Sequence, residues 1–512
     1  MRFVKTYWCA ILLFHSLFSD ESQAQNEDNI WMLGCEMPDH NSGINFNFGQ
    51  ADTFTVVRDL CFFLTNASIC DTNGQLLYYT NGCSINNRNH DTLFNSQNFN
   101  PGWLTNYYQP YGMGLPQGCL IVPRPNHYGQ YYLFHESGEI VNVGIFAVAQ
   151  PLNLSYSLID MSLDNGLGGI AAGQKNVHAI NDTLIYGRIT GVKHANGRDW
   201  WIITHKSNSN HYIKNLVTPD TILGPYYQQI GRTHNFERFL QQVALSPLGD
   251  KFAIELTADT NIVFGNILDL FDFDRCTGAF SNEQHIIVPD SELLANGCSF
   301  SPNGRFLYVS TNLNIYQYDT WAANINASVK HVAAWDSFSS PLKTKFLFHQ
   351  LAPDGKIYIS TSEGSNVLHI INSPDSIDTL CNVIQNSFFL PALNNAYMPN
   401  APNYSLGRLQ GSPCDTIQWT GLLSANEKRL ELTLNPNPNN GNFSLSYSLP
   451  QNKSGMLEVF DVNGRKLFSE KLSAWSSFKK IQLQNINEGI YLAVITCGDL
   501  RISKKFVLVN AD

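Results

Sequence analysis

The chain has 512 residues, which is too long for a single hydrophobic core and predicts two or three domains. Hydrophobic residues make up 43% of it and charged residues only 14%, below the roughly 25% of a typical soluble domain. The net charge is −10 and no Lys/Arg cluster stands out in the body, so nucleic acid is not an expected partner. This composition favours a secreted, β-rich protein over a cytosolic enzyme.

The first 24 residues have the pattern of a secretory signal peptide. A short basic start, MRFVK, precedes an apolar stretch and a small-residue exit. The apolar run is too short to cross about 30 Å of hydrocarbon as a membrane anchor. We therefore expect cleavage between Ala24 and Gln25 and entry into an oxidising compartment.

Ten of the eleven cysteines remain after such cleavage, and an oxidising compartment favours disulfides over reactive thiols. No CxxC or Cys/His spacing indicates zinc. Sequence alone does not fix the connectivity, but proximity in the predicted strands favours certain pairs. These pairs are Cys61 with Cys70, Cys83 with Cys119, Cys276 with Cys298, and Cys381 with Cys414.

Residues 25–415 form the body of the chain and repeat a turn followed by a strand. Three copies align without gaps, SPLGDKFAI, SPNGRFLYV and APDGKIYI, and three looser copies precede them. In each copy a glycine stands where a positive φ closes a hairpin. The turn glycines are Gly74, Gly129, Gly197, Gly249, Gly304 and Gly355.

Successive turn glycines lie 51 to 68 residues apart, with about four short strands in each interval. This period predicts a β-propeller rather than a pair of β-sandwiches. Seven blades are favoured, with six or eight as alternatives. In this prediction the segments near Asn29 and Cys381 combine into the seventh blade, which closes the ring and leaves no free sheet edge.

Two groups of polar side chains are candidates for chemistry in the body. Four histidines fall within 34 residues, but their spacing matches no metal signature and favours structural roles. Asp272 and Asp274 lie two apart on one side of a predicted strand and could bind calcium, although aspartates also favour turns. No cofactor, metal site or catalytic residue is predicted. The histidines are His178, His194, His205 and His211.

Aromatic residues are concentrated in PGWLTNYYQPYG, which we interpret as a loop. Exposed loop aromatics suit sugar stacking or protein contact. The candidate ligand residues are Trp103, Tyr107, Tyr108 and Tyr111. Trp200 and Trp201 lie instead in a predicted strand, where at least one of them is expected in the core.

Residues 431–512 form a small all-β module after a linker at residues 416–430. NFSLSYSL places Phe443, Leu445 and Tyr447 on one face of a half-buried strand. Asn463-Gly464 lies between two apolar runs and predicts a tight hairpin. About seven short strands give a small β-sandwich, whose alternative role is that of an accessory module binding a sugar or a protein.

The tail resembles the type A sorting domain of the type IX secretion system. The matching residues are Asn435, Pro436, Asn437, Pro438, Gly441, Asp461, Gly464, Gly489, Tyr491, Lys504 and Lys505. The body is similar to the WD-repeat-like propellers of secreted Bacteroidetes proteins that carry this domain. The resemblance implies export by the outer-membrane secretion machinery. It also implies removal of the tail, after which the propeller is released or attached to surface lipopolysaccharide.

Two classes of function follow for the exported propeller. A binding protein for a protein or polysaccharide is favoured because no catalytic motif is present. The alternative is a hydrolase or lyase that acts on an extracellular polymer. Carboxylates and histidines converging in the central channel would favour the enzyme, whereas backbone and small polar groups there, with exposed aromatic loops, would favour binding.

Overall fold

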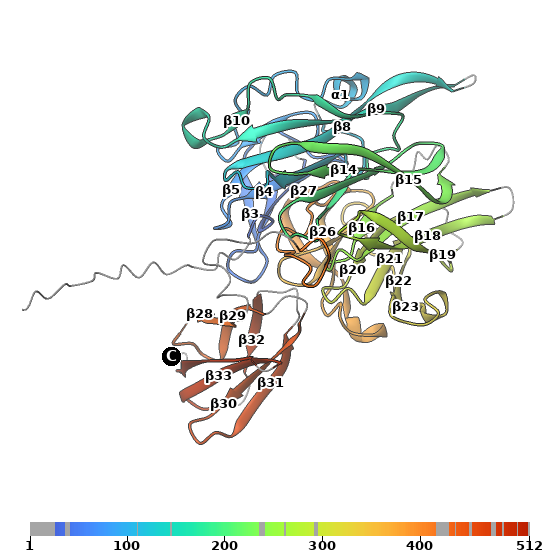
Figure 1. Cartoon of the computed structure of the whole chain (residues 1–512). Helices are drawn as coiled ribbons and strands as arrows, with labels where there is room; N and C mark the ends of the chain where they lie inside the picture. The colour runs from blue at the N-terminus through green and yellow to red at the C-terminus, as the bar shows by residue number, and fades with distance from the viewer. Residues whose placement is uncertain are drawn as a thin grey trace, which may run out of the picture.

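The computed structural model contains a large β-sheet body and a smaller β-sheet tail (Figure 1). The described residues are 26–35, 41–109, 111–143, 146–234, 241–260, 263–290, 295–415, 430–435, 437–449, 453–472, 478–483, 486–498 and 500–509. Within these ranges no helix has the length and apolarity needed to cross a membrane. The predicted signal peptide, its cleavage site at Ala24 and Gln25, and residues 416–429 of the predicted linker lie outside them.

The strands of the body form seven antiparallel sheets within the described ranges, and we call these sheets blades 1 to 7. Blade 1 has β1 (Ile30–Leu33), β2 (Asn41–Asn45) and β3 (Asp52–Val56). Blade 2 has β4 (Ala67–Cys70), β5 (Leu76–Thr80) and β6 (Ile85–Asn87). Blade 3 has β7 (Cys119–Pro123), β8 (Gln130–Val143), β9 (Phe146–Asp160), β10 (Gly169–Ile170) and β11 (Val177–Asn181). Blade 4 has β12 (Thr190–Lys193), β13 (Trp200–His205), β14 (Ser209–Val217) and β15 (Ile222–His234).

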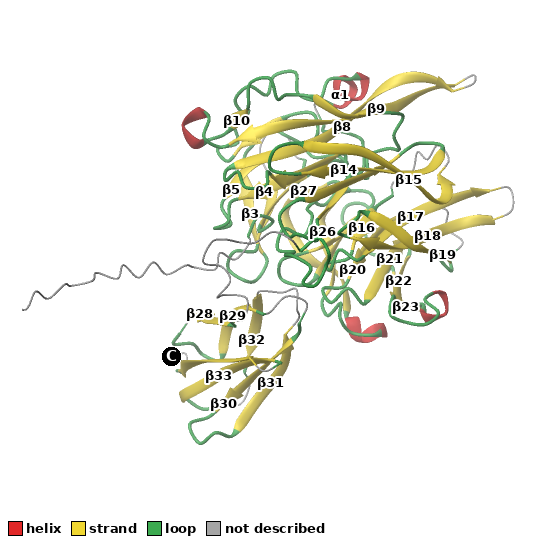
Figure 2. Ribbon diagram, in the orientation of Figure 1, coloured by secondary structure: helices red, strands yellow, loops and turns green. Residues whose placement is uncertain are grey.

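Blade 5 has β16 (Val243–Leu245), β17 (Lys251–Thr260), β18 (Val263–Asp274) and β19 (Ala279–Ile287). Blade 6 has β20 (Ala295–Phe300), β21 (Phe306–Thr311), β22 (Asn314–Asp319) and β23 (Lys330–Ala334). Blade 7 has β24 (Phe346–Leu351), β25 (Ile357–Thr361), β26 (Ser365–Ile371) and β27 (Val383–Asn394). The helices are short (Figure 2): α1 (Trp103–Tyr108) and the 3-10 turns Asp164–Gly166, Asn326–Ser328 and Asp378–Cys381.

The blades form a closed ring because each one shares a hydrophobic core with the next. The first strands β4, β7, β12, β16, β20 and β24 contact one another in order and surround the axis of the ring. One buried residue marks each shared core in order around the ring. Phe62 lies between blades 1 and 2, Ile121 among blades 2 to 4, and Phe252 between blades 4 and 5. Leu268 lies between blades 5 and 6, Ile359 between blades 6 and 7, and Trp31 between blades 7 and 1. The structure is therefore a seven-bladed β-propeller, which confirms the predicted fold class.

The six predicted turn glycines lie between the first and second strands of blades 2 to 7. Their φ values fall between 70° and 78°, which is the left-handed region that glycine adopts without steric cost. All six turns lie on one side of the ring, and we call that side the turn face. The start of each first strand lies on the opposite side, which we call the entry face.

The prediction that the two ends of the body combine into one blade is wrong. The segment after Asn29 forms β1, which pairs with β2, and the segment after Cys381 forms β27, which pairs with β26. Each segment thus pairs with a strand close to it in sequence, where loop closure costs less entropy. The two blades still pack together, because the Ser42 hydroxyl donates to the Ala392 carbonyl oxygen (3.1 Å).

An extended segment at residues 395–409, which we call the channel segment, follows β27 and runs along the axis of the ring. Its Asn400 amide N–H donates to the Asn66 carbonyl oxygen (2.8 Å) where blade 2 begins. Farther along, the Tyr404 hydroxyl donates to the carbonyl oxygen of Ile121 in blade 3 (2.9 Å). Tyr404 and Leu406 are both buried, so the chain fills its own central channel.

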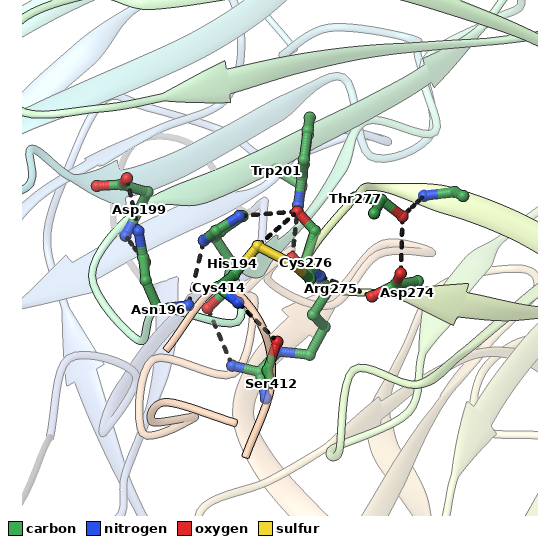
Figure 3. Close-up of a disulfide and its surroundings, with 11 residues drawn as sticks. His194, Asn196, Asp199, Trp201, Asp274, Arg275, Cys276, Thr277, Ser412 and Cys414 are labelled. Atoms are coloured by element: carbon green, nitrogen blue, oxygen red, sulfur yellow. Dashed lines mark hydrogen bonds between the residues drawn. A yellow bond between two sulfur atoms is a disulfide. The ribbon is translucent and has the colours of Figure 1, made fainter. Parts of the chain in front are cut away.

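Four of the cysteines in the structure form disulfides, and none of the predicted pairs is among them. Cys35 pairs with Cys61, and Cys276 pairs with Cys414 at the end of the body (Figure 3), with Cα–Cα distances of 4.5 and 5.4 Å. Cys35 and Cys61 lie in loops that follow the first and last strands of blade 1, whereas Cys276 and Cys414 are 138 residues apart and meet only because the end of the body returns to blade 5. The predicted partners Cys70, Cys83, Cys119, Cys298 and Cys381 are instead buried and take no part in these two disulfides.

The tail is a sandwich of two antiparallel sheets, as predicted. One sheet has the order β28-β29-β32 and the other the order β31-β30-β33-β34. Phe443 and Leu445 of the first sheet pack against Val459 and Phe506 of the second. The tail strands are β28 (Glu431–Asn435), β29 (Asn442–Ser448), β30 (Gly455–Phe460), β31 (Lys466–Leu472), β32 (Phe478–Gln482), β33 (Gly489–Cys497) and β34 (Leu500–Leu508).

Candidate functional site

The four histidines singled out in the sequence do not converge on one site. His178 bonds to the Ser155 hydroxyl (2.9 Å), and His194 bonds through Nε2 to the Cys276 carbonyl oxygen (2.9 Å, Figure 3). His205 is buried with its ring against Tyr212, and the His211 amide N–H donates to the Ser209 hydroxyl (3.1 Å). Within the described ranges no three His, Cys, Asp or Glu side chains are grouped so as to hold a metal ion.

The two carboxylates proposed for calcium are each engaged by neighbouring groups. Asp272 accepts hydrogen bonds from Lys251 Nζ (2.7 Å) and Asn282 Nδ2 (2.6 Å). Asp274 accepts from the Cys276 amide N–H and the Thr277 hydroxyl, both at 2.8 Å, within the turn between β18 and β19. Both therefore have structural partners at a strand end, which is an ordinary position for aspartate.

Polar groups in the central channel are directed at backbone and amide partners. Asn400 Nδ2 donates to the carbonyl oxygens of Cys119 and Ile189, both at 2.8 Å. Asn400 Oδ1 accepts from Gln117 Nε2 (3.2 Å), which also donates to the Val243 carbonyl oxygen (3.1 Å). The channel is a packed, hydrogen-bonded part of the protein interior. Sequence reasoning missed this segment because its residues have no strand alternation.

Trp103, Tyr107 and Tyr108 of the segment predicted as a loop lie in the short helix α1 beside the β8–β9 hairpin, and Tyr111 lies in the turn that follows. Trp103 and Tyr107, one turn apart, stack with ring centroids 5.1 Å apart and planes within 13°. Their side chains are 40% and 63% exposed, and Tyr111 is 58% exposed. We call Trp103, Tyr107 and Tyr111 the aromatic platform.

The opposite side of α1 holds the platform in place. Leu104 is buried and the Thr105 hydroxyl bonds to the Ser137 hydroxyl in β8 (2.9 Å). Tyr108 stacks on Phe63 with centroids 5.8 Å apart, and its partial burial raises the pKa of its hydroxyl. Tyr108 is thus a support for the platform, and no pattern in the sequence indicated its partner Phe63.

The platform and the tail lie at opposite ends of the molecule. Helix α1 precedes β7 and therefore lies on the entry face, whereas the body ends at the Cys276–Cys414 disulfide on the turn face. Figure 1 shows α1 at the top and the tail at the bottom. A surface bound by the platform would thus not meet the tail.

The residues that matched the sorting motif build the turns and core of the tail. Asn437 Oδ1 accepts from the Val507 amide N–H (2.9 Å), which ties the Asn-Pro turn to β34. Asp461 Oδ1 accepts from the Asn463 and Arg465 amides around the hairpin turn, where Gly464 has a φ of 78°. The Tyr491 hydroxyl donates to the Asn487 carbonyl oxygen (2.6 Å).

Five further motif residues are placed as follows. Gly441 has a φ of 93° and begins the connection into β29, and Gly489 begins β33. Lys504 and Lys505 are exposed on the edge strand β34. Asn435 ends β28. Pro436 lies outside the described residues.

Residues 433–509 match the family model described as a secretion system C-terminal sorting domain. No curated protein matches the chain. Among solved structures, the chain is similar to a functionally unknown protein from Desulfotomaculum acetoxidans, at 10% identity over 89% of this chain and 99% of that one, with a TM-score of 0.32.

The chain is also similar to the Swd1 β-propeller domain of Myceliophteria thermophila, at 11% identity over 73% of this chain and 99% of that one, with a TM-score of 0.28. A quinonprotein alcohol dehydrogenase-like protein from Bacteroides thetaiotaomicron is similar at 11% identity over 71% of this chain and 85% of that one, with a TM-score of 0.29. At such scores the propeller assignment rests on the strand pairing of this chain. The tail is a type IX secretion C-terminal sorting domain, and the chain is a β-propeller protein that this domain directs to the cell surface or the extracellular space.

Proposed function

We propose that the exported propeller is a binding protein that attaches to polysaccharide through the aromatic platform on its entry face. The stacked and exposed pair Trp103 and Tyr107 carries this proposal. Large exposed aromatic rings on a rigid support mark contact surfaces, because an apolar face held in water gains free energy when it is covered.

The chemistry of a sugar ring suits this surface. One face of a pyranose presents C–H groups that pack against an aromatic face, while its hydroxyls need hydrogen-bonding partners at the rim. Asn106 and Gln109 of the same segment are exposed beside the rings and have amide groups that both donate and accept. The filled channel leaves the faces of the ring as the surface on which a polymer can lie.

A hydrolase or lyase acting on an extracellular polymer is the second candidate. Its substrate would be expected at the axis of the ring, where the channel segment is hydrogen-bonded to blades 2, 3 and 4. This packing favours binding over cleavage. A hydrolase or lyase would release soluble sugar fragments from a polymer incubated with the protein, whereas a binding protein would not.

The test uses the full chain and pull-down on insoluble cellulose, chitin and xylan. We expect the Trp103→Ala/Tyr107→Ala variant to bind its preferred polymer at least about tenfold more weakly, because each ring contributes roughly 1 kcal/mol of contact. The matched control is Trp321→Ala, which removes an exposed tryptophan held over Arg305 in blade 6. Equal binding by the platform variant and the wild type would overturn the proposal.

A further inference from the structure

The four-stranded sheet of the tail has one covered face and one open face. Leu457 and Ala493 point inward and are buried against the three-stranded sheet. The alternating positions point outward, where Met456, Ile490 and Leu492 are 38–44% exposed although they are apolar. Isolated exposed apolar residues are common, but these three belong to the two central strands of one sheet.

The strand register places the outward residues side by side on one face, with Glu458 and the buried Val494 opposite each other in its middle. Leu492 of β33 lies opposite the half-buried Phe460 of β30, and Thr496 lies opposite Met456. Ile490 lies opposite Val507 of β34. The apolar stripe therefore runs along β30 and β33, which are the inner strands of the sheet.

Cationic side chains flank this stripe on both outer strands. Lys466 and Lys471 of β31 lie opposite Phe460 and Met456, and both are exposed. On the other edge, exposed Lys505 and Arg501 of β34 lie opposite Leu492 and Thr496. We call the stripe with these four cations the open face.

The charge of the tail differs from that of the rest of the chain. Residues 431–512 contain nine Lys/Arg and seven Asp/Glu, whereas residues 1–430 contain 23 and 35. The tail thus carries a net charge of +2 and the rest a net charge of −12. Four of the nine tail cations lie on the open face, so the face is complementary to an acidic partner.

We propose that the open face is the surface by which the tail docks on the type IX secretion machinery, and that the machinery presents an acidic protein surface with an apolar centre. This rests on the export role of the tail and is independent of polysaccharide binding by the body. Apolar contact at the centre would supply affinity, and the flanking cations would supply orientation and salt-dependent association.

A single acidic residue in the middle of the face favours a protein partner over an anionic lipid surface. Glu458 of β30 lies between Met456 and Phe460 and accepts a hydrogen bond from Lys466 Nζ (2.8 Å). A layer of lipid phosphates would bring negative charge directly over this carboxylate. A protein can place a hydrogen-bond donor there and its acidic groups opposite the cations.

The first test measures export of the full chain from its native host. We expect Ile490→Glu/Leu492→Glu to lower the extracellular fraction at least tenfold, with accumulation in the periplasm. The matched control is Val462→Glu, which places the same charge on an exposed apolar position in the hairpin turn. Hydrogen exchange of the periplasmic material reports whether the variant tail is folded. Wild-type export of a folded double variant would overturn the proposal.

The second test leaves the apolar stripe intact. Lys466→Glu/Lys505→Glu reverses two cations on opposite edges of the open face. We expect severalfold less of the outer-membrane machinery to co-purify with this variant than with the wild type. The difference between variant and wild type should be larger at low salt than at high salt. The wild-type complex should weaken as salt is raised. Binding of the wild-type tail to vesicles of anionic phospholipid, with unchanged recovery of the machinery by the variant, would overturn the proposal in favour of a lipid partner. Polysaccharide binding is measured on the same variants and should not change.

Discussion

The blades of the body and the four-stranded sheet of the tail differ in how many of their faces are buried. In blade 7, the consecutive residues Tyr358 and Ile359 are buried in two separate cores, because blades 1 and 6 cover both faces of the sheet. In the tail, the consecutive residues Leu492 and Ala493 point to opposite faces, and only Ala493 is buried. A ring covers every sheet twice, whereas a two-layer sandwich covers each sheet once.

This difference indicates where each region can make contact with other molecules. The body has used its sheet faces and its channel for folding, so that only loops and rims such as the aromatic platform remain for ligands. The tail leaves apolar side chains on one sheet face partly exposed, among them Met456, Ile490 and Leu492. We therefore expect the body and the tail to unfold independently of each other, and three substitutions test this.

The largest effect is expected from Phe506→Ala in the tail. Phe506 is fully buried and its ring lies 4.9 Å from that of Phe443. Loss of the ring should lower the free energy of unfolding of the tail by about 3–5 kcal/mol. Hydrogen exchange read by mass spectrometry should show faster exchange in the tail alone, and Val462→Ala should have little effect. Parallel loss of protection in the body would contradict independence.

A smaller effect is expected from Asn400→Ala in the channel segment. The change leaves the carbonyl oxygens of Cys119 and Ile189 buried without their donor and should cost about 3 kcal/mol. Exchange should accelerate in blades 2 to 4 while protection of the tail is unchanged. Ser405→Ala, at an exposed position of the same segment, is the control. A body as stable as the wild type would show that the segment does not hold the ring together.

The smallest effect is expected from His349→Leu and depends on pH. Burial, assisted by nearby His369, lowers the pKa of His349 from 6.5 to about 3. Below pH 6.5 the unfolded chain takes up a proton that the folded body does not, so this histidine lowers stability by about 1.4 kcal/mol per pH unit as pH falls towards 3. Replacing it with leucine removes the penalty.

As the pH falls from 7.0 to 4.5, the free energy of unfolding of the His349→Leu body should therefore rise by about 2.7 kcal/mol relative to that of the wild type. Denaturant unfolding at the two pH values measures this gain. The tail contains no histidine and serves as an internal reference, and exposed His331→Leu is the control. If the difference in free energy of unfolding between wild type and variant were the same at both pH values, the expected burial of His349 would be contradicted.

The parts of the fold that the sequence predicted are those fixed by local chemistry. Gly304 in Ser-Pro-Asn-Gly has a φ of 73°, as a closed hairpin turn requires, and five other glycines repeat that geometry. The alternation in NFSLSYSL likewise gives the half-buried strand β29 with Phe443 and Leu445 inside. Such patterns need no knowledge of distant partners.

The candidate site was predicted only in part. The sequence identified the aromatic residues, but it did not show that Trp103 and Tyr107 stack on one side of a helix while Tyr108 packs beneath against Phe63. That division depends on the β8–β9 hairpin, which covers the inner side of α1. The predicted pair of Cys61 with Cys70 failed because the folding of blade 1 places Cys61 beside Cys35 instead.

By itself the sequence determined the blade period and the turn geometry, because each depends on contacts within one hairpin. It also determined the strand-rich tail and its sorting motif, because strand alternation and motif residues are local patterns in the sequence. Only the tertiary structure decided how the ring closes, that the channel segment fills its axis, and which cysteines pair. Asn400 is 281 residues from Cys119, and Cys276 is 138 residues from Cys414. Contacts at such separations form only after the blades have packed, so no local pattern encodes them.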